Sequence, residues 1–229
     1  MTPRPAATLV AVRQGIGDIE VLMLERPARG FFGGLWVFPG GGVEEIDDSP
    51  LAREVTEFPP DADDHRWRVA ALRETIEEVG LAITRPGLAD GIGGVGEAVF
   101  SQLAARQYRL DAARLRLLSQ WVTPAEAPTR FDARFYLTIV DGDPTLRPQP
   151  EEVMAVEWTT PGSALRRFDD GEWAMVTPTL HHLRWLVGFQ QTDDVWDAAT
   201  RASGQRIKPV LERDGSEVRV RLPADAELP

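Results

Sequence analysis

The sequence contains no cysteine among its 229 residues. This absence excludes a disulfide framework, a thiolate nucleophile and a zinc site built on thiolates. The chain also lacks any run of about 18 consecutive apolar residues, so the sequence predicts no membrane span. Its first residues hold no apolar stretch of the kind that begins a secretion signal, and we therefore expect a cytoplasmic protein.

Basic residues are few relative to acidic ones. The 25 lysines and arginines face 36 aspartates and glutamates, which gives a formal net charge of −11. Binding along a nucleic acid needs clustered Lys and Arg, so this balance argues against a nucleic-acid partner. A small phosphorylated ligand stays compatible, because one local basic pocket or a bound cation can neutralise it. The length suits one sizeable core, and we expect residues 1–229 to form a single domain.

Strand-like and helix-like segments are mixed along the chain without strict alternation. Short β-branched runs predict strands, and longer runs with a period near 3.6 residues predict helices. The expected strands are 6–13, 19–24, 35–38, 115–122, 134–140 and 153–158, and the expected helices are 67–79, 97–107, 163–168, 178–189 and 193–202. This mixture predicts the α/β class, as an α/β/α sandwich with a mixed β-sheet.

Two further segments stand apart from this pattern. Residues 44–64 are acidic and contain three prolines, so we expect an exposed insertion with little regular structure. Near the C-terminus, 207–211 and 218–222 flank an Asp-Gly pair that is typical of hairpin turns. Residues 204–229 are therefore predicted to form a C-terminal β-hairpin extension. Its role stays open between capping the sheet, making a homodimer contact and binding another protein.

The predicted helix 67–79 carries an acidic patch. Glu74, Glu77 and Glu78 are neighbours on one face, opposite an apolar stripe. Arg73 can offset part of their repulsion by reaching Glu77 one turn on. A hard divalent cation, Mg²⁺ or Mn²⁺, would offset more, because such ions prefer carboxylate oxygens. The same pattern alone is also typical of a solvated helix face, and that interpretation competes with the metal site.

A glycine-rich loop upstream favours the metal site. Pro39-Gly40-Gly41 carries little side chain, which lets backbone approach a ligand closely. Together with Arg73-Glu74-Thr75-Ile76-Glu77-Glu78-Val79-Gly80-Leu81, this loop resembles the two ends of the Nudix box. Gly41 stands at the first glycine of that box, and Asp47 stands where the box has glutamate. Twenty-five residues separate Asp47 from Arg73, whereas the box has seven there, so eighteen are extra. We place this insertion at 48–66.

An insertion at this position is similar to that of one Nudix branch, which includes the peroxisomal coenzyme A diphosphatase and its bacterial relatives. The stretches 30–41 and 121–137 resemble the same branch. The resemblance implies a hydrolase in which a metal-activated water attacks a diphosphate linkage, with Mg²⁺ or Mn²⁺ as cofactor. The implied substrate is a small nucleoside diphosphate derivative, of the coenzyme A or acyl-CoA, ADP-ribose or dinucleotide type. The alternative is a catalytically idle Nudix domain that binds a nucleotide and regulates another process.

The resemblance also implies roles for individual residues of the box. Glu77 and Glu78 would be the principal metal ligands, with Glu74 as an additional ligand. The carbonyl of Gly41 would complete the metal site. Arg73 would orient the carboxylates.

Residues outside the helix complete the expected site. Glu152 is the candidate general base, and Glu151 and Asp132 are the alternatives; a solvated acidic turn is an equal interpretation of the glutamate pair. Arg26 and Arg29, with Gly40 and Gly41, are expected to meet the substrate. The match to the coenzyme A signature of related enzymes is partial, because Pro27 follows Arg26 where that signature has serine.

Overall fold

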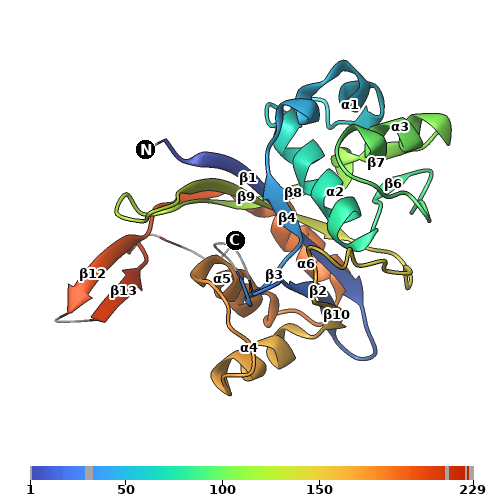
Figure 1. Cartoon of the computed structure of the whole chain (residues 1–229). Coiled ribbons are helices and arrows are strands. Elements are labelled where there is room, and N and C mark those ends of the chain that lie inside the picture. Colours follow the sequence, from blue (N-terminus) through green and yellow to red (C-terminus); the bar gives the residue numbers. More distant parts are fainter. Residues whose placement is uncertain (1, 29–32, 215–216, 225, 227–229) are drawn as a thin grey trace.

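The computed structural model describes residues 2–28, 33–214, 217–224 and 226 (Figure 1). Its strands are β1 (Arg4–Gln14), β2 (Ile19–Glu25), β3 (Trp36–Val37), β4 (Gly40–Gly42), β5 (Thr56–Glu57), β6 (Thr84–Arg85), β7 (Arg109–Asp111), β8 (Arg116–Val122), β9 (Phe131–Ile139), β10 (Ala155–Thr159), β11 (Gln205–Ile207), β12 (Val210–Asp214) and β13 (Glu217–Arg221). Its helices are α1 (Pro50–Glu54), α2 (His65–Val79), α3 (Glu97–Ala105), α4 (Pro161–Asp169), α5 (Thr177–Leu186) and α6 (Thr192–Arg201), with short 3-10 turns η1 (Glu45–Asp48) and η2 (Ala112–Arg114). No helix in these described ranges is both long and apolar enough to cross a membrane.

The largest sheet is mixed, as the sequence predicts. Its strands follow the order β10-β2-β1-β9-β8-β11, and β3 and β4 add to β2 and β1. The pairs β1–β9 and β8–β11 are parallel, whereas β1–β2, β8–β9 and β10–β2 are antiparallel. Strand β1 therefore lies in the middle of the sheet, and β4 brings the glycine-rich loop alongside it.

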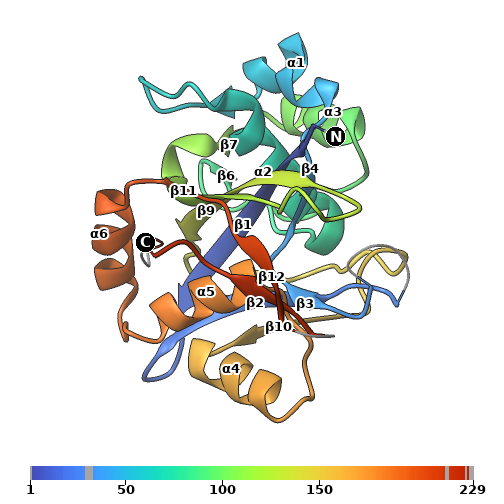
Figure 2. The same cartoon turned by 90° about the vertical axis from the view of Figure 1, so that its left-hand side faces the viewer.

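The central strand β1 serves two hydrophobic cores, because successive side chains of a strand point to opposite faces. Leu9 and Ala11 pack in the core that α1, α2 and α3 cover. Val10 and Val12 pack in the core that α4, α5 and α6 cover. Figures 1 and 2 show these two helical layers on opposite sides of the sheet. The predicted α/β/α sandwich is confirmed.

The prediction that the insertion has little regular structure is wrong. Ser49 caps α1 by accepting a hydrogen bond from the Ala52 backbone nitrogen at 3.2 Å, and Pro50 begins the helix. Ala52 and Val55 are buried in the core beside α3. Strand β5 then pairs with β7 in a separate three-stranded sheet. The acidic, proline-rich composition hid these elements, because prolines and a serine at helix starts are local caps as well as loop residues.

The predicted C-terminal hairpin is present with shifted bounds. Ile207 lies in β11, which pairs parallel to β8 and extends the large sheet, so the expectation that it begins the hairpin is wrong. The hairpin consists of β12 and β13, with Val210 opposite Arg221 and Asp214 opposite Glu217. Gly215 of the expected turn lies outside the described residues. Figure 1 shows this hairpin projecting away from the two helical layers.

A buried polar chain ties α5 to the sheet. Trp121 donates its ring N–H to Ser119 Oγ at 3.0 Å, and Ser119 Oγ lies 2.8 Å from His182 Nε2. The other ring nitrogen of His182 lies 2.7 Å from the Pro178 carbonyl, which can only accept. Nδ1 is therefore the protonated nitrogen of a neutral imidazole, and Nε2 accepts from the Ser119 hydroxyl. Burial lowers the pKa of His182 from 6.5 to about 3.

We expect His182 to make the protein less stable in acid. The unfolded chain takes up a proton at this histidine near pH 6.5, whereas the folded chain does so only near pH 3. The contribution is therefore fully present above pH 6.5 and is lost as the pH falls towards 3, by up to roughly 1.4 kcal/mol per pH unit. Urea denaturation from pH 7 to pH 4 measures this slope. His182→Asn lacks the titrating group, so its slope should be shallower by that amount; parallel curves would contradict the assignment.

Candidate active site

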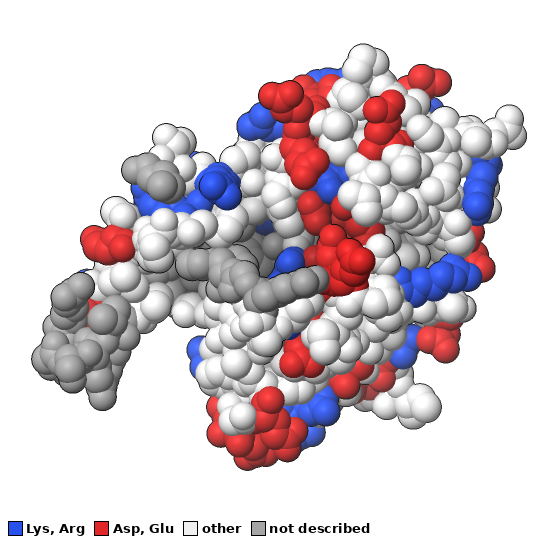
Figure 3. Space-filling model, viewed as in Figure 1, with Lys and Arg blue, Asp and Glu red and all other residues white. Residues whose placement is uncertain are grey.

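Helix α2 presents acidic side chains on one face because its other face is fixed in the core. Val69, Leu72 and Ile76 are buried there. Gly80 ends the helix in the left-handed conformation, with φ of 71°, as expected of a C-terminal glycine. The helix packs against β1 and β4, so its acidic face lies over the glycine-rich strand Gly40–Gly42. Acidic side chains gather on this part of the surface in Figure 3.

Arg73 is the centre of this polar face and is almost completely buried. Its Nε and Nη2 donate to the two oxygens of Asp47 at 2.7 and 3.1 Å, and Nη2 also donates to the Gly42 carbonyl at 3.0 Å. Burial disfavours the charged guanidinium and by itself lowers the pKa of Arg73. The Asp47 hydrogen bond and the nearby carboxylates nevertheless hold this pKa above its ordinary value. Asp47, which replaces the glutamate of the box, thus fixes a charged arginine under the acidic face.

Arg73 holds two of the three helix glutamates. Its Nη1 lies 3.0 Å from Glu74 Oε1 and donates to Glu77 Oε2 at 3.1 Å. The other oxygen of Glu77 accepts from the Gly96 backbone nitrogen, at the start of α3, at 2.7 Å. Burial raises the pKa of Glu74 to about 7, against the lowering effect of Arg73. The contact with Gly96 was not predicted, although the run of glycines at 91–96 marks a loop where backbone can come close.

Glu78 is bound by the strand ends on the other side of the helix. Oε1 accepts from Arg26 Nη2 at 2.6 Å, and Oε2 accepts from the Gly40 backbone nitrogen at 2.8 Å. The same arginine nitrogen donates to the Gly40 carbonyl. Burial outweighs these partners and raises the pKa of Glu78 to about 8. Arg26, expected to meet substrate, therefore lies directly beside the helix carboxylates.

Two of the three glycines of the loop lie where a side chain would make close contacts. A Cβ atom on Gly40 would lie 2.4 Å from the Ala7 carbonyl oxygen, and Gly40 has φ of 152°. A Cβ atom on Gly41 would lie 2.4 Å from the Glu74 carboxylate. Gly42, by contrast, has no atom within 4 Å of such a Cβ. Gly41 is thus the position at which the loop backbone faces Glu74.

Gly41→Ala is expected to lower the hydrolytic rate by roughly tenfold or more, because the new methyl group must displace the Glu74 carboxylate and misplaced groups cost large factors in rate. Gly42→Ala is the matched control, and we expect it to keep the wild-type rate. Steady-state rates with a diphosphate substrate measure both variants. Equal rates for the two variants would show that the contact between Gly41 and Glu74 has no part in the reaction.

The charges of this face suit a divalent cation. Four carboxylates meet two guanidinium groups, Asp47, Glu74, Glu77 and Glu78 against Arg26 and Arg73. We call the four acidic residues the carboxylate cluster. If all were ionised, the cluster and its arginines would carry two excess negative charges. Burial is the main cause of the raised pKa values of Glu74 and Glu78, and repulsion from neighbouring carboxylates adds to it. Hard carboxylate oxygens are the ligands that Mg²⁺ and Mn²⁺ prefer. Within the described ranges, no three His, Asp or Glu side chains already stand in a metal-holding arrangement. The arginines and backbone amides contact these carboxylates instead.

The remaining expected site residues lie at different distances from the cluster. Glu152 is exposed and close enough to Glu78 to raise its pKa. Its loop is docked on the end of α2, since the Gln149 backbone nitrogen donates to the Glu78 carbonyl at 2.9 Å. Asp132 instead binds Gln120 and Arg206, each at 2.7 Å, which gives it a structural role. Arg29 lies outside the described residues.

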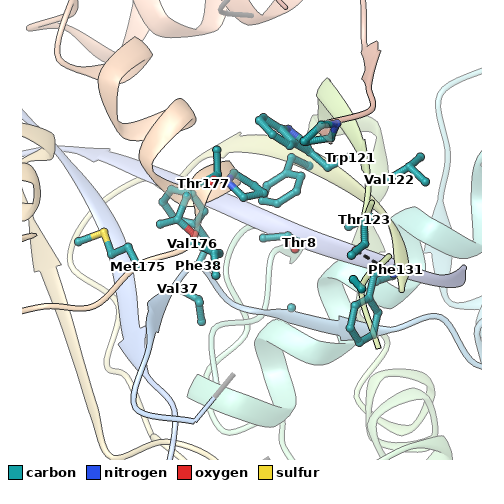
Figure 4. A pocket seen from close by; sticks show the side chains of 18 of the residues that line it. Thr8, Val37, Phe38, Trp121, Val122, Thr123, Phe131, Met175, Val176 and Thr177 are labelled. Carbon is teal, nitrogen blue, oxygen red and sulfur yellow. Dashed lines mark hydrogen bonds between the residues drawn. The ribbon is translucent and has the colours of Figure 1, made fainter. Parts of the chain in front are cut away.

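A pocket of about 620 Å³ opens beside the cluster and is mostly apolar (Figure 4). Its lining includes Arg26 and Gly40–Gly42 at one side, and it continues over segments far apart in the sequence. These segments are the strands β1, β3, β8 and β9, the loop after β8, residues 175–179 before and within α5, and residues 209, 211 and 220 in and beside the hairpin. We call this space the apolar pocket. No local pattern marks it, because its walls meet only in the folded chain.

Comparisons with known proteins show the family of this chain. The NUDT19 Nudix domain family matches residues 52–186, which is more than half of the chain. The acyl-coenzyme A diphosphatase NUDT19 of Homo sapiens is 28% identical over 234 residues, which cover 77% of this chain and 62% of that protein. The putative nudix hydrolase 7 of Caenorhabditis elegans is 29% identical over 205 residues, covering 83% of this chain and 62% of that protein. This chain thus spans less than two thirds of the length of these relatives.

A solved structure extends the comparison to the whole fold. A NUDIX hydrolase from Alicyclobacillus acidocaldarius is 33% identical, with a TM-score of 0.74 over 86% of this chain and 96% of that one. Nudix hydrolases generally use divalent metal ions, in keeping with the charge of the carboxylate cluster. With the family match over residues 52–186, these findings show that the chain belongs to the Nudix hydrolase family, in its NUDT19 branch.

Proposed function

We propose that this chain hydrolyses the diphosphate linkage of a coenzyme A or acyl-coenzyme A type substrate, with Mg²⁺ or Mn²⁺ as cofactor. The observation that carries the proposal is the net negative carboxylate cluster at the edge of the apolar pocket, in which Asp47 and Glu78 are buried and the other two glutamates are partly buried. The names of the NUDT19 relatives support the substrate class.

In this proposal, Glu74, Glu77 and Glu78, with the Gly41 carbonyl, would hold the metal ion. When bound, the ion supplies positive charge that stabilises the negative charge developing on the phosphate oxygens. Arg73 keeps Glu74 and Glu77 in place through its own anchor on Asp47. These fixed partners favour catalysis, because preorganised charges need little rearrangement as the reaction proceeds.

The reaction replaces one phosphorus–oxygen bond by another. A water oxygen bonds to one phosphorus, the bridging oxygen leaves with the other phosphate, and the water proton goes to a base. Glu152 is our candidate base, because it is exposed next to Glu78 on a loop docked to α2. Arg26 is our candidate for binding a substrate phosphate, since its side chain is 28% exposed and lines the apolar pocket.

A substrate panel tests the proposal. Coenzyme A, acetyl-coenzyme A, ADP-ribose and a dinucleoside polyphosphate would each be incubated with the protein, with and without Mg²⁺ or Mn²⁺. Mass spectrometry identifies the products and shows which phosphorus receives the water oxygen when the solvent is ¹⁸O-labelled. We expect cleavage of the coenzyme A compounds only with a divalent ion. Preferential cleavage of ADP-ribose would reassign the substrate, and tight binding without turnover of any compound would favour the regulatory alternative.

A further inference from the structure

The lining of the apolar pocket changes character with distance from the carboxylate cluster. Near the cluster, Arg26 and the glycines of β4 offer charge and backbone polar groups. Further away, the lining is aromatic and aliphatic, and Figure 4 shows Phe38, Trp121 and Phe131 around the cavity. A ligand whose diphosphate lies at the cluster would therefore extend an apolar portion into the pocket.

The polar side chains of the lining are too few for a phosphorylated nucleoside. Among the described lining residues, Arg26 is the one cationic side chain, and it is bound to Glu78. The other polar side chains are threonines: Thr8, Thr123, Thr177 and Thr179. A sugar phosphate placed there would lose its hydration without charged partners, which is costly. A hydrocarbon chain has no charged group to dehydrate, and its binding becomes more favourable with each methylene that is buried.

The outer wall of the pocket comes from the C-terminal hairpin. Leu211 on β12 and Val220 on β13 are directly opposite in the strand register. Side chains of such a pair lie on the same face of a hairpin, and both residues line the pocket, next to Pro209. Val220 is 47% exposed. An apolar ligand that reaches the hairpin would cover this exposed surface.

We propose that Leu211 and Val220 are specificity-determining residues, which form the far wall of a subsite for the acyl chain and favour long acyl groups over short ones. This inference rests on the proposed function, because the acyl group is taken to belong to the diphosphate substrate. It assigns the projecting hairpin a role in substrate choice, instead of a role confined to closing the sheet.

The neighbouring residue Val210 offers a matched control. It is 46% exposed, similar to Val220, but it is not part of the pocket lining. It precedes Leu211, and successive side chains of a strand point to opposite faces. Val210→Asn therefore makes the same kind of change on the other face of the same hairpin.

The experiment measures kcat/KM of the full chain for coenzyme A and its acetyl, hexanoyl and decanoyl thioesters. For the wild type, we expect KM to fall with chain length by up to about fourfold per methylene, the factor that corresponds to ~0.8 kcal/mol. Leu211→Asn and Val220→Asn should each lower the ratio of kcat/KM for decanoyl-coenzyme A to that for coenzyme A by about tenfold. Val210→Asn should keep the wild-type ratio. The inference would be overturned if the wild-type KM did not change with chain length. It would also be overturned if all three variants had the same ratio of kcat/KM for decanoyl-coenzyme A to that for coenzyme A.

Failure of the proposed function gives a different result. In that case no coenzyme A compound is cleaved by the wild type with either metal ion. Calorimetric titration of coenzyme A and decanoyl-coenzyme A without a divalent ion still tests the subsite. Tighter binding of the decanoyl compound, lost in Leu211→Asn and kept in Val210→Asn, would support the subsite without turnover. Equal binding of the two compounds would contradict it.

Discussion

Replacing Arg73 by methionine is expected to lower the free energy of unfolding by about 3–5 kcal/mol, the scale observed when one partner of a buried ion pair is removed. The reason is that Asp47 is buried with both of its oxygens on this guanidinium, and Glu74 and Glu77 share the remaining nitrogen. Without Arg73, three carboxylates would face one another with no compensating charge. Urea denaturation at neutral pH measures the loss.

Arg53→Met is the control for this substitution. Arg53 pairs with Asp48 at 2.5 Å, but both side chains are about half exposed. Exposed pairs contribute roughly 0–1 kcal/mol, so this variant should unfold close to the wild type. If the free energy of unfolding fell by the same amount in the two variants, the Arg73 ion pairs would contribute no more than an exposed pair.

Glu78→Gln should separate activity from stability. We expect the hydrolytic rate to fall by at least about a hundredfold, because the substitution removes a carboxylate from the proposed metal site and an amide is a weaker ligand for Mg²⁺ or Mn²⁺. The free energy of unfolding should change by less than about 1 kcal/mol, because burial already disfavours the ionised form of Glu78 and raises its pKa to about 8, so that a neutral amide replaces a largely neutral carboxyl group. Arg26 is 28% exposed and keeps its bond to the Gly40 carbonyl, so it is not left as a buried, unpaired charge.

Glu54→Gln is the matched control, since Glu54 is an exposed residue of α1. Its rate and stability should both stay at the wild-type values. Steady-state rates and urea denaturation curves of the two variants show whether Glu78→Gln lowers the rate without lowering the stability. If Glu78→Gln unfolded far more easily than the wild type, its low rate would report damage to the fold and not loss of a catalytic residue.

Much of the fold follows from local pattern. The run of small and β-branched apolar residues in β1 reflects a strand that is buried on both faces. The helical period of α2 reflects burial of one helix face against the sheet. The contact of Arg73 with Glu77 is also local, since side chains four residues apart on a helix are neighbours. Sequence reasoning therefore places the acidic face and its opposite apolar stripe correctly.

Contacts between distant segments were beyond that reasoning. Asp47 is buried because it lies in η1, twenty-six residues before Arg73. Its hydrogen bond with Arg73 makes it part of the polar face. The glycine-rich stretch 91–96 indicates a loop, but nothing local indicates that the Gly96 amide binds Glu77. The insertion departs from the prediction for a related reason: its composition is that of a loop, while Ala52 and Val55 pack in a core shared with α3, which follows much later in the chain. Ile207 falls within the segment 207–211 predicted as the first hairpin strand, although its pairing partner is β8.

The most direct test of the account compares the wild type with Glu77→Gln for cleavage of a coenzyme A compound with Mg²⁺. Glu77 is held by Arg73 and by the backbone of Gly96, so its position is fixed and the substitution keeps its shape. We expect the wild type to release two phosphorylated products only with the divalent ion. We expect Glu77→Gln to retain at most about one hundredth of the wild-type rate. Cleavage by Glu77→Gln at the wild-type rate would contradict the assignment of the reaction to the carboxylate cluster.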